Sequence, residues 1–197
     1  SAAFRAGKRV RSETAIGEGS TSVASAAVHL TARILGDLSR HTTLVVGAGE
    51  TGTLVCTYLK ERGAKVAVVN RSLDKAVSLA GSIGAQAAPL SRLPQQMIDA
   101  DAVICATASS TPLITLEMVK EAQRARRGKM LLLVDISLPH NIEPGVADIS
   151  NVLINNMNDL RAIVDQNLSR RAAQLPLAIE IIDEELQAFY DYRQTLS

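Results

Sequence analysis

Short apolar runs alternate with amphipathic segments between residues 20 and 156. The apolar runs are nearly continuous, which is typical of strands buried on both faces of a parallel sheet. They occupy residues 43–46, 65–69, 85–88, 101–105, 130–134 and 152–154. The intervening segments predict helices over residues 20–38, 53–60, 73–83, 93–100 and 115–125, with Ser20 or Thr21 as the cap of the first and Thr115 as the cap of the last. This alternation predicts an α/β fold, a doubly wound, Rossmann-type parallel sheet with helices on both faces.

The two ends of the chain show only a helical pattern. Residues 2–11 suit an amphipathic helix with a solvated cationic face, and residues 12–19, with Gly17 and Gly19, suit a linker. Apolar residues recur at three- and four-residue spacing from 158 to about 195, which predicts a helix about 55 Å long. Pro176 should kink that helix or start a second one. Because so long an amphipathic helix needs a partner, we expect a homodimer.

Three glycines directly follow the first predicted strand, at the spacing G-x-G-x-x-G. Gly47 allows a tight turn, Gly49 lets the backbone approach a pyrophosphate, and Gly52 lets the next helix pack closely on the strand. The free N–H groups of the helix's first turn point at the phosphates. Alone this motif is weak, but a strand before it and a helix after it strengthen it. The predicted dinucleotide-binding residues are Gly47, Ala48, Gly49, Glu50, Thr51 and Gly52.

The end of the second predicted strand indicates which dinucleotide is bound. It reads Asn70-Arg71-Ser72, with no Asp or Glu to hold a ribose 2′-hydroxyl. A guanidinium flanked by an amide and a hydroxyl suits a 2′-phosphate, with Arg71 as the bidentate partner. NADPH is therefore favoured over NADH. The alternative is a polar turn in which Ser72 only caps the next helix, and the two roles are compatible.

Two further loops should lie at the same edge of the sheet, because ligands of such folds bind at the carboxyl ends of the strands. Ala106, Thr107 and Ala108 open a loop of small residues after the fourth strand, and Asp135 opens a loop with two prolines after the fifth. We expect these four residues to flank the nicotinamide.

Composition narrows the alternatives. Apolar residues make up 47% of the 197 residues and the net charge is +1, which fits a globular protein without overall attraction to nucleic acid or anionic lipid. No apolar run spans a bilayer and no signal peptide is visible, so we expect no membrane association and a cytoplasmic location. The chain begins with Ser, within a helical pattern, and we expect it to be a fragment of a longer polypeptide.

The cysteines, two of the histidines and one cationic run belong to no recognisable catalytic or binding motif. Cys56 and Cys105 lie in apolar stretches and are predicted to be core thiols rather than nucleophiles. His41 and His140 are predicted to be structural or surface groups. A cationic run could contact RNA, although a solvated helix end is the favoured interpretation. That run comprises Arg124, Arg126, Arg127 and Lys129.

The motifs together resemble the glutamyl-tRNA reductase family in order and over essentially the whole chain. The matching stretches are residues 8–14 with 16–17, 22–28, 47–52, 70–72, 135–139 with 142–144, 158–160, Asn167 and Arg170-Arg171. The resemblance implies a reaction in which a cysteine of an N-terminal domain forms a thioester from glutamyl-tRNA. NADPH then reduces that thioester to glutamate-1-semialdehyde, for the synthesis of tetrapyrroles such as haem and chlorophyll.

The resemblance also implies how this chain divides. Residues 1–19 correspond to the tail of the catalytic domain and a linker, residues 20–156 to the NADPH domain, and residues 157–197 to the start of the dimerisation domain. The region with the nucleophilic cysteine is absent, so no catalytic residue is assigned and the chain alone should be inactive. Implied partners are glutamyl-tRNA, a second copy of the chain and glutamate-1-semialdehyde aminomutase. In a plant or alga the location would be the plastid stroma.

Two other interpretations remain open. A shikimate-dehydrogenase-like NADP reductase shares the nucleotide-binding unit and the Asn-Arg-Ser loop, but needs a substrate domain with a Lys–Asp pair for which the chain has no room. A non-catalytic module is the other, in which the C-terminal helix dimerises or docks a regulator and the nucleotide is only structural.

Overall fold

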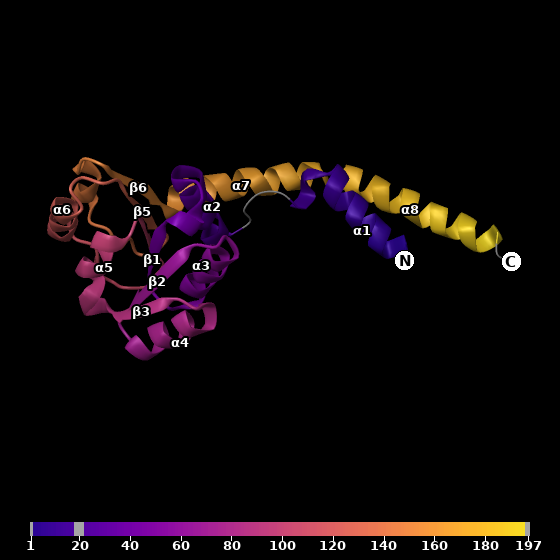
Figure 1. Cartoon of the computed structure of the whole chain (residues 1–197). Coiled ribbons are helices and arrows are strands. Elements are labelled where there is room, and N and C mark those ends of the chain that lie inside the picture. Colours follow the sequence, from indigo (N-terminus) through magenta and orange to yellow (C-terminus); the bar gives the residue numbers. More distant parts are fainter. Residues whose placement is uncertain (1, 18–21, 196–197) are drawn as a thin grey trace. The chain divides into compact units, whose positions relative to one another are not determined.

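The chain is described by a computed structural model that covers residues 2–17 and 22–195 (Figure 1). It divides into two compact units, residues 22–161 and the two terminal segments 1–21 and 162–197. No helix among the described residues is both long and apolar enough to cross a membrane.

The larger unit contains a six-stranded, fully parallel sheet. Its order is β3-β2-β1-β4-β5-β6, so the direction of strand addition reverses between β1 and β4. The strands are β1 (Thr42–Val46), β2 (Lys65–Asn70), β3 (Gln86–Pro89), β4 (Ala102–Cys105), β5 (Leu131–Asp135) and β6 (Val152–Asn156). Each lies within a few residues of its predicted position, and the doubly wound α/β fold is confirmed.

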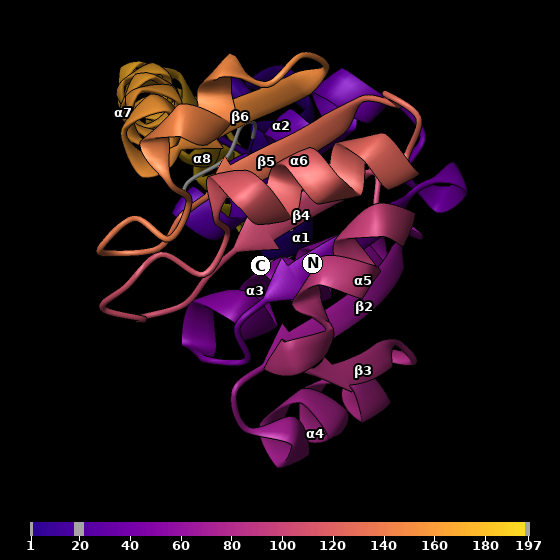
Figure 2. The ribbon, with the colours of Figure 1, turned by 90° about the vertical axis from the view of Figure 1, so that its left-hand side faces the viewer.

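Helices cover both faces of this sheet (Figure 2). They are α2 (Val23–Leu35), α3 (Glu50–Glu61), α4 (Leu73–Ile83), α5 (Leu93–Asp99) and α6 (Leu116–Ala125). Alternate strand residues, among them Leu44, Val103 and Leu133, join α5 and α6 in one buried cluster. Their neighbours Val45, Ile104 and Leu132 are equally buried and point to the opposite face. The sheet is thus apolar on both sides, as its continuous hydrophobic runs predict.

Helix starts follow the expected capping chemistry with one correction. Ser72 and Thr115 accept hydrogen bonds from the N–H groups of Lys75 and Met118, as predicted for the caps of α4 and α6. The caps proposed at Ser20 and Thr21 lie outside the described residues. The described cap of α2 is Ser22, which forms a reciprocal capping box with Ser25.

The smaller unit consists of α1 (Ala2–Glu13), a 3₁₀ turn (Ala15–Gly17), most of α7 (Met157–Ala173) and α8 (Leu175–Thr195). The break between α7 and α8 confirms the interruption predicted at Pro176. Helix α1 reaches beyond its predicted end, and Gly19 of the predicted linker lies outside the described residues. α1 packs against α8, where Arg5 and Arg9 pair with Glu184 and Glu185. The cationic face of α1 is therefore partly used inside the unit rather than only solvated.

Candidate nucleotide-binding site

The strand register brings four loops to one edge of the sheet. Val46 of β1 is level with Val69 of β2 and with Cys105 of β4, and Cys105 is level with Asp135 of β5. The loops that follow these strands therefore begin side by side at the carboxyl edge. This edge includes the point between β1 and β4 where strand order reverses, which is where doubly wound sheets bind their ligands.

The three glycines of the first loop occupy three different environments. Gly47 has a φ of +115°, and a Cβ there would lie 2.3 Å from the carbonyl oxygen of Ala106. A Cβ on Gly52 would lie 2.2 Å from the carbonyl oxygen of Gly47, so the first turn of α3 packs directly on the preceding turn. A Cβ on Gly49 would meet nothing within 4 Å. Two glycines are thus required by packing, whereas the third leaves open space beside the backbone.

The start of α3 faces that open space without a side-chain cap. Gly49 is the N-cap and makes no side-chain hydrogen bond. The N–H groups of Glu50, Thr51 and Gly52 precede the first residue that can bond within the helix. Backbone donors of this kind, together with the positive end of the helix dipole, suit an anionic group.

The second loop is tied to the first through Asn70. The Asn70 Oδ1 accepts a hydrogen bond from the Ala48 N–H at 3.3 Å, and its Nδ2 donates to the Ser72 carbonyl at 3.1 Å. Both ends of the amide therefore shape the loops. Arg71 is exposed and forms no ion pair with any residue that the structure describes. Its guanidinium remains free for a ligand.

These loops enclose a cavity of about 530 Å³, a size typical of small-molecule sites. Nine predicted residues line it, whereas Glu50, Thr51, Gly52 and Asp135 do not. The nine are Gly47, Ala48, Gly49, Asn70, Arg71, Ser72, Ala106, Thr107 and Ala108. The cavity therefore joins the glycine turn, the Asn-Arg-Ser loop and the loop after β4.

Lys75 also lines the cavity and was missed by the sequence reasoning. It lies in the first turn of α4, three residues beyond the cap at Ser72, and its side chain is exposed. A cation three positions after a cap returns to the same end of the helix, and this spacing is the signal that could have identified it. Arg71 and Lys75 make the end of the cavity beside β2 positively charged.

The opposite wall is built by the loop after β4, supported by the loop after β5. The Thr107 N–H donates to the Ser137 Oγ at 3.2 Å, and the Asn141 Nδ2 donates to the Ser109 carbonyl at 3.1 Å. Ser109 lines the cavity as well. Ser137 and Asn141 are almost fully buried. The two loops predicted to lie together are thus bonded to each other.

Asp135 lies beneath this wall, only 2% exposed. Its Oδ1 accepts the Ser137 N–H at 3.0 Å, and its Oδ2 accepts the N–H groups of Asn141 and Ile142 at 2.7 and 3.3 Å. The His140 Nδ1 lies 3.5 Å from the same oxygen. Three backbone donors offset the cost of burying a carboxylate.

Both cysteines are buried in the core, as predicted. Burial raises the pKa of the Cys56 thiol to about 12. Burial also raises the pKa of Cys105 well above its usual range, and the neighbouring Asp135 carboxylate adds to that shift. A nucleophilic cysteine needs the opposite shift. No group of three His, Cys, Asp or Glu side chains within the described part of the chain is arranged to hold a metal ion.

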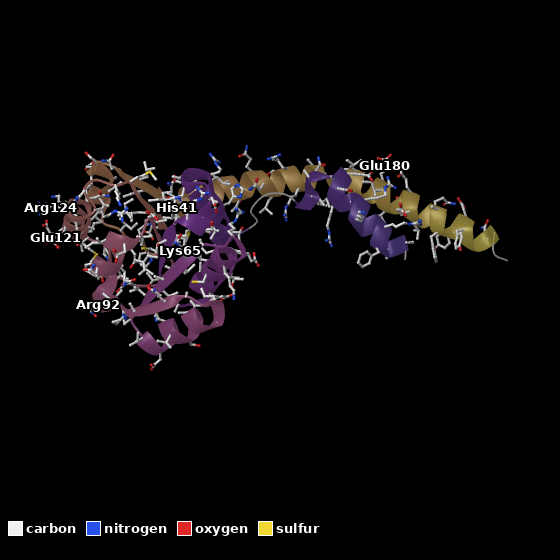
Figure 3. All side chains as sticks on the ribbon, viewed as in Figure 1. His41, Lys65, Arg92, Glu121, Arg124 and Glu180 are labelled. Atoms are coloured by element: carbon white, nitrogen blue, oxygen red, sulfur yellow. The ribbon has the colours of Figure 1, made fainter. Side chains whose placement is uncertain are left out.

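The cationic run at the end of α6 contains one side chain whose predicted role is wrong, Arg126. Arg124 points away from the sheet (Figure 3), and Arg127 and Lys129 are also exposed. Arg126, in contrast, is 6% exposed, and desolvation by burial lowers its pKa. Its guanidinium donates to the carbonyls of residues 97, 98, 100 and 130, so it closes the end of α5 rather than facing solvent.

His41 has a structural partner, as predicted for this residue type. Its Nδ1 lies 3.2 Å from the Asp101 Oδ2, and the same oxygen accepts the Thr42 N–H at 3.0 Å. This contact joins the starts of β1 and β4, whereas the cavity lies at the ends of these strands.

Comparison with known proteins places these features in a family context. The model of the family described as "Shikimate / quinate 5-dehydrogenase" matches residues 29–163. A protein named glutamyl-tRNA reductase from Saccharophagus degradans is 45% identical over 93% of this chain and 43% of its own length. Another of that name, from Sorangium cellulosum, is 41% identical over 95% of this chain and 35% of its own length.

A solved structure shows the same arrangement. Glutamyl-tRNA reductase from Methanopyrus kandleri superposes with a TM-score of 0.91 and 40% identity, over 99% of this chain and 49% of its own. The chain thus spans less than half the length of each of these three relatives.

Proposed function

The chain belongs to the family described as "Shikimate / quinate 5-dehydrogenase", and we propose that within it this chain is the NADPH-binding part of a glutamyl-tRNA reductase. The complete enzyme would reduce glutamyl-tRNA, through an enzyme thioester, to glutamate-1-semialdehyde for tetrapyrrole synthesis. The role of this chain is to bind the cofactor and present it to a separate catalytic domain.

The shape of the glycine turn carries the cofactor assignment. Gly49 leaves an open space beside the backbone that a side chain would fill. The uncapped start of α3 supplies backbone N–H groups next to this space. A diphosphate fits both features. Arg71 and Lys75 then supply two cations for a 2′-phosphate, which favours NADPH over NADH. The nicotinamide would lie toward the wall formed by residues 106–109, where the bound cofactor supplies the hydride.

The extent of the similarity separates the two reductase interpretations. The family model covers residues 29–163, which form the nucleotide-binding unit alone. Proteins named glutamyl-tRNA reductase match 92–98% of the chain, which is more than the family model matches. A shikimate-dehydrogenase-like reductase would share only the nucleotide-binding unit with this chain, so the match outside that unit supports the glutamyl-tRNA reductase assignment.

Calorimetry with NADPH and NADH tests the cofactor assignment. We expect the chain to bind NADPH more tightly, and expect Arg71→Ala and Lys75→Ala each to weaken NADPH binding by about tenfold or more, since each removes a charge-assisted contact. NADH affinity should not change. Arg124→Ala, which removes an exposed cation outside the cavity, is the matched control. Equal affinity of the unaltered chain for the two cofactors would refute the role of Arg71.

The remaining parts of the proposal concern partners and turnover. Homodimerisation through α7 and α8 predicts that deleting residues 158–197 abolishes dimers in light scattering and leaves NADPH affinity unchanged. The chain alone should not consume glutamyl-tRNA, because its two thiols are buried and protonated. Turnover by the isolated chain would contradict the need for a separate catalytic domain. Interaction with glutamate-1-semialdehyde aminomutase and a cytoplasmic or plastid location belong to the same proposal.

A further inference from the structure

The cavity wall opposite Arg71 and Lys75 is held by the loop after β5, in addition to one bond of its own, in which the Ser109 N–H donates to the Thr107 Oγ1 at 3.3 Å. Residues 106–109 line the cavity, and two contacts from the loop after β5 fix this wall. The first is the hydrogen bond between the Thr107 N–H and the Ser137 Oγ, and the second joins the Asn141 Nδ2 to the Ser109 carbonyl. Figure 2 shows the two loops side by side at one edge of the sheet.

Both holding residues depend on one carboxylate. The Asp135 Oδ1 accepts the backbone N–H of Ser137, and its Oδ2 accepts the backbone N–H of Asn141. All three residues are almost fully buried. The buried Asp135 carboxylate therefore holds both Ser137 and Asn141. These two residues in turn bond to Thr107 and Ser109 of the cavity wall.

There is little room for this wall to move. The carbonyl of Ala106 lies where a side chain on Gly47 would be, so the wall is in contact with the glycine turn. A shift of the wall toward the turn is blocked by that contact, and a shift away from it breaks the bonds to Ser137 and Asn141. Small misplacements of a binding wall weaken binding strongly, because its groups no longer reach the ligand.

We propose that Asp135 is a positioning residue, which acts through Ser137 and Asn141 to fix the wall that receives the nicotinamide half of the cofactor. This inference rests on the proposed NADPH site. It replaces the expectation that Asp135 itself flanks the nicotinamide, because Asp135 does not line the cavity. The anion sets the position of the wall, and the wall contacts the ligand.

The test compares two ligands in the whole chain by calorimetry. NADPH should contact the wall, whereas 2′,5′-ADP lacks the nicotinamide and its ribose and should contact only the other loops. Ser137→Ala removes the acceptor of the Thr107 N–H. We expect Ser137→Ala to weaken NADPH binding about five- to tenfold, as the loss of one hydrogen bond does. Binding of 2′,5′-ADP should not change. Ser137→Cys, with a weaker acceptor of similar shape, should give a smaller loss in the same direction.

Thr115→Ala is the matched control. It also removes a hydroxyl that accepts a backbone N–H at 3.2 Å, but at the start of α6, outside the cavity. It should lower the melting temperature and change neither dissociation constant. As a second measurement, hydrogen exchange of the Thr107 amide should be faster in both Ser137 variants than in the unaltered chain. If Ser137→Ala does not fold, Ser137→Cys and this exchange rate carry the test.

The possible outcomes distinguish failure of the positioning role from failure of the proposed NADPH site. If the unaltered chain binds neither ligand, the proposed NADPH site is refuted. If it binds both, and a Ser137 variant weakens both equally or neither, the positioning role is overturned while the NADPH site stands. Loss confined to NADPH, with faster exchange at Thr107, supports the positioning role.

Discussion

The two compact units are stabilised in different ways. In residues 22–161, core strands such as β4 and β5 are fully buried, and apolar side chains pack on both faces of the sheet. In the smaller unit α1 contains no buried residue and is joined to α8 partly through Arg5 and Arg9. Phe4, Ile179 and Phe189 stay exposed. The difference indicates that the nucleotide-binding unit is stable by itself, whereas the helical unit retains exposed apolar surface, which the proposed dimer would cover.

The largest expected effect is in the larger unit, at Arg126. Replacing it with Leu leaves the carbonyls of Ile98, Ala100 and Met130 without their donor in a buried place. We expect a loss of about 3 kcal/mol or more in the free energy of unfolding, measured by urea denaturation. Arg124→Leu, on the exposed side of α6, should change it by less than about 0.5 kcal/mol. Similar losses in the two variants would show that the buried guanidinium does not hold this end of the sheet.

The next effect separates the glycines within one loop. Gly47→Ala places a Cβ 2.3 Å from the Ala106 carbonyl at a φ of +115°, and should cost about 1–3 kcal/mol and abolish NADPH binding. Gly49→Ala meets open space, so it should leave the melting temperature nearly unchanged and still weaken NADPH binding. Thermal unfolding and calorimetry on the same samples check both. A Gly49→Ala variant with unaltered affinity would mean that no ligand approaches this backbone.

A moderate effect comes from the buried thiol of Cys56, whose pKa of about 12 exceeds the usual value of 9.0. Because the folded-state pKa is the raised one, the contribution is complete below pH 9 and is lost as the pH rises from 9 toward 12. Unfolding free energy should fall by up to about 1.4 kcal/mol per pH unit in this window from this one group. Denaturation at several pH values measures the slope. In Cys56→Ala the unfolding free energy should depend less steeply on pH. An equal slope would show that Cys56 does not cause this dependence.

The smallest effect is expected in the helical unit. Arg9 pairs with Glu13, Glu184 and Glu185, and hydrogen bonds to these carboxylates raise its pKa. Ion pairs that stay exposed to solvent contribute little to stability and weaken in salt. Arg9→Gln, or 1 M NaCl, should therefore speed hydrogen exchange in α1 and leave the central strands unchanged. Equal responses in α1 and β4 would contradict the contrast between the units.

Sequence pattern predicts the larger unit well for a physical reason. Strands buried on both faces are continuous apolar runs, and G-x-G-x-x-G has a steric cause at Gly47 and Gly52 that the structure reproduces. Side-chain destinations are less predictable, because they depend on contacts distant in sequence. Arg126 and Lys129 belong to the same charged run, yet only the first finds unpaired carbonyls of another helix within reach.

The candidate site shows the same limit. Backbone positions such as Ala48 and Ala106 follow from strand ends, which the sequence marks clearly. Lys75 was missed because its role depends on the direction in which α4 leaves the loop. The bonds from Asp135 to Ser137 and Asn141 could not be foreseen, since they depend on how the loop folds back on its own first residue.

The segment from Arg71 to Lys75 shares no hydrogen bond with residues 106–109 or 135–142 among those the structure describes. The bonds from this end of β2 to the glycine turn are made by the residues just before the segment, Val69 and Asn70. In the proposed site, the preference for NADPH over NADH therefore depends on a segment that can be exchanged independently. Replacing these few positions with an acidic loop should convert the site to NADH and leave the wall at residues 106–109 unchanged.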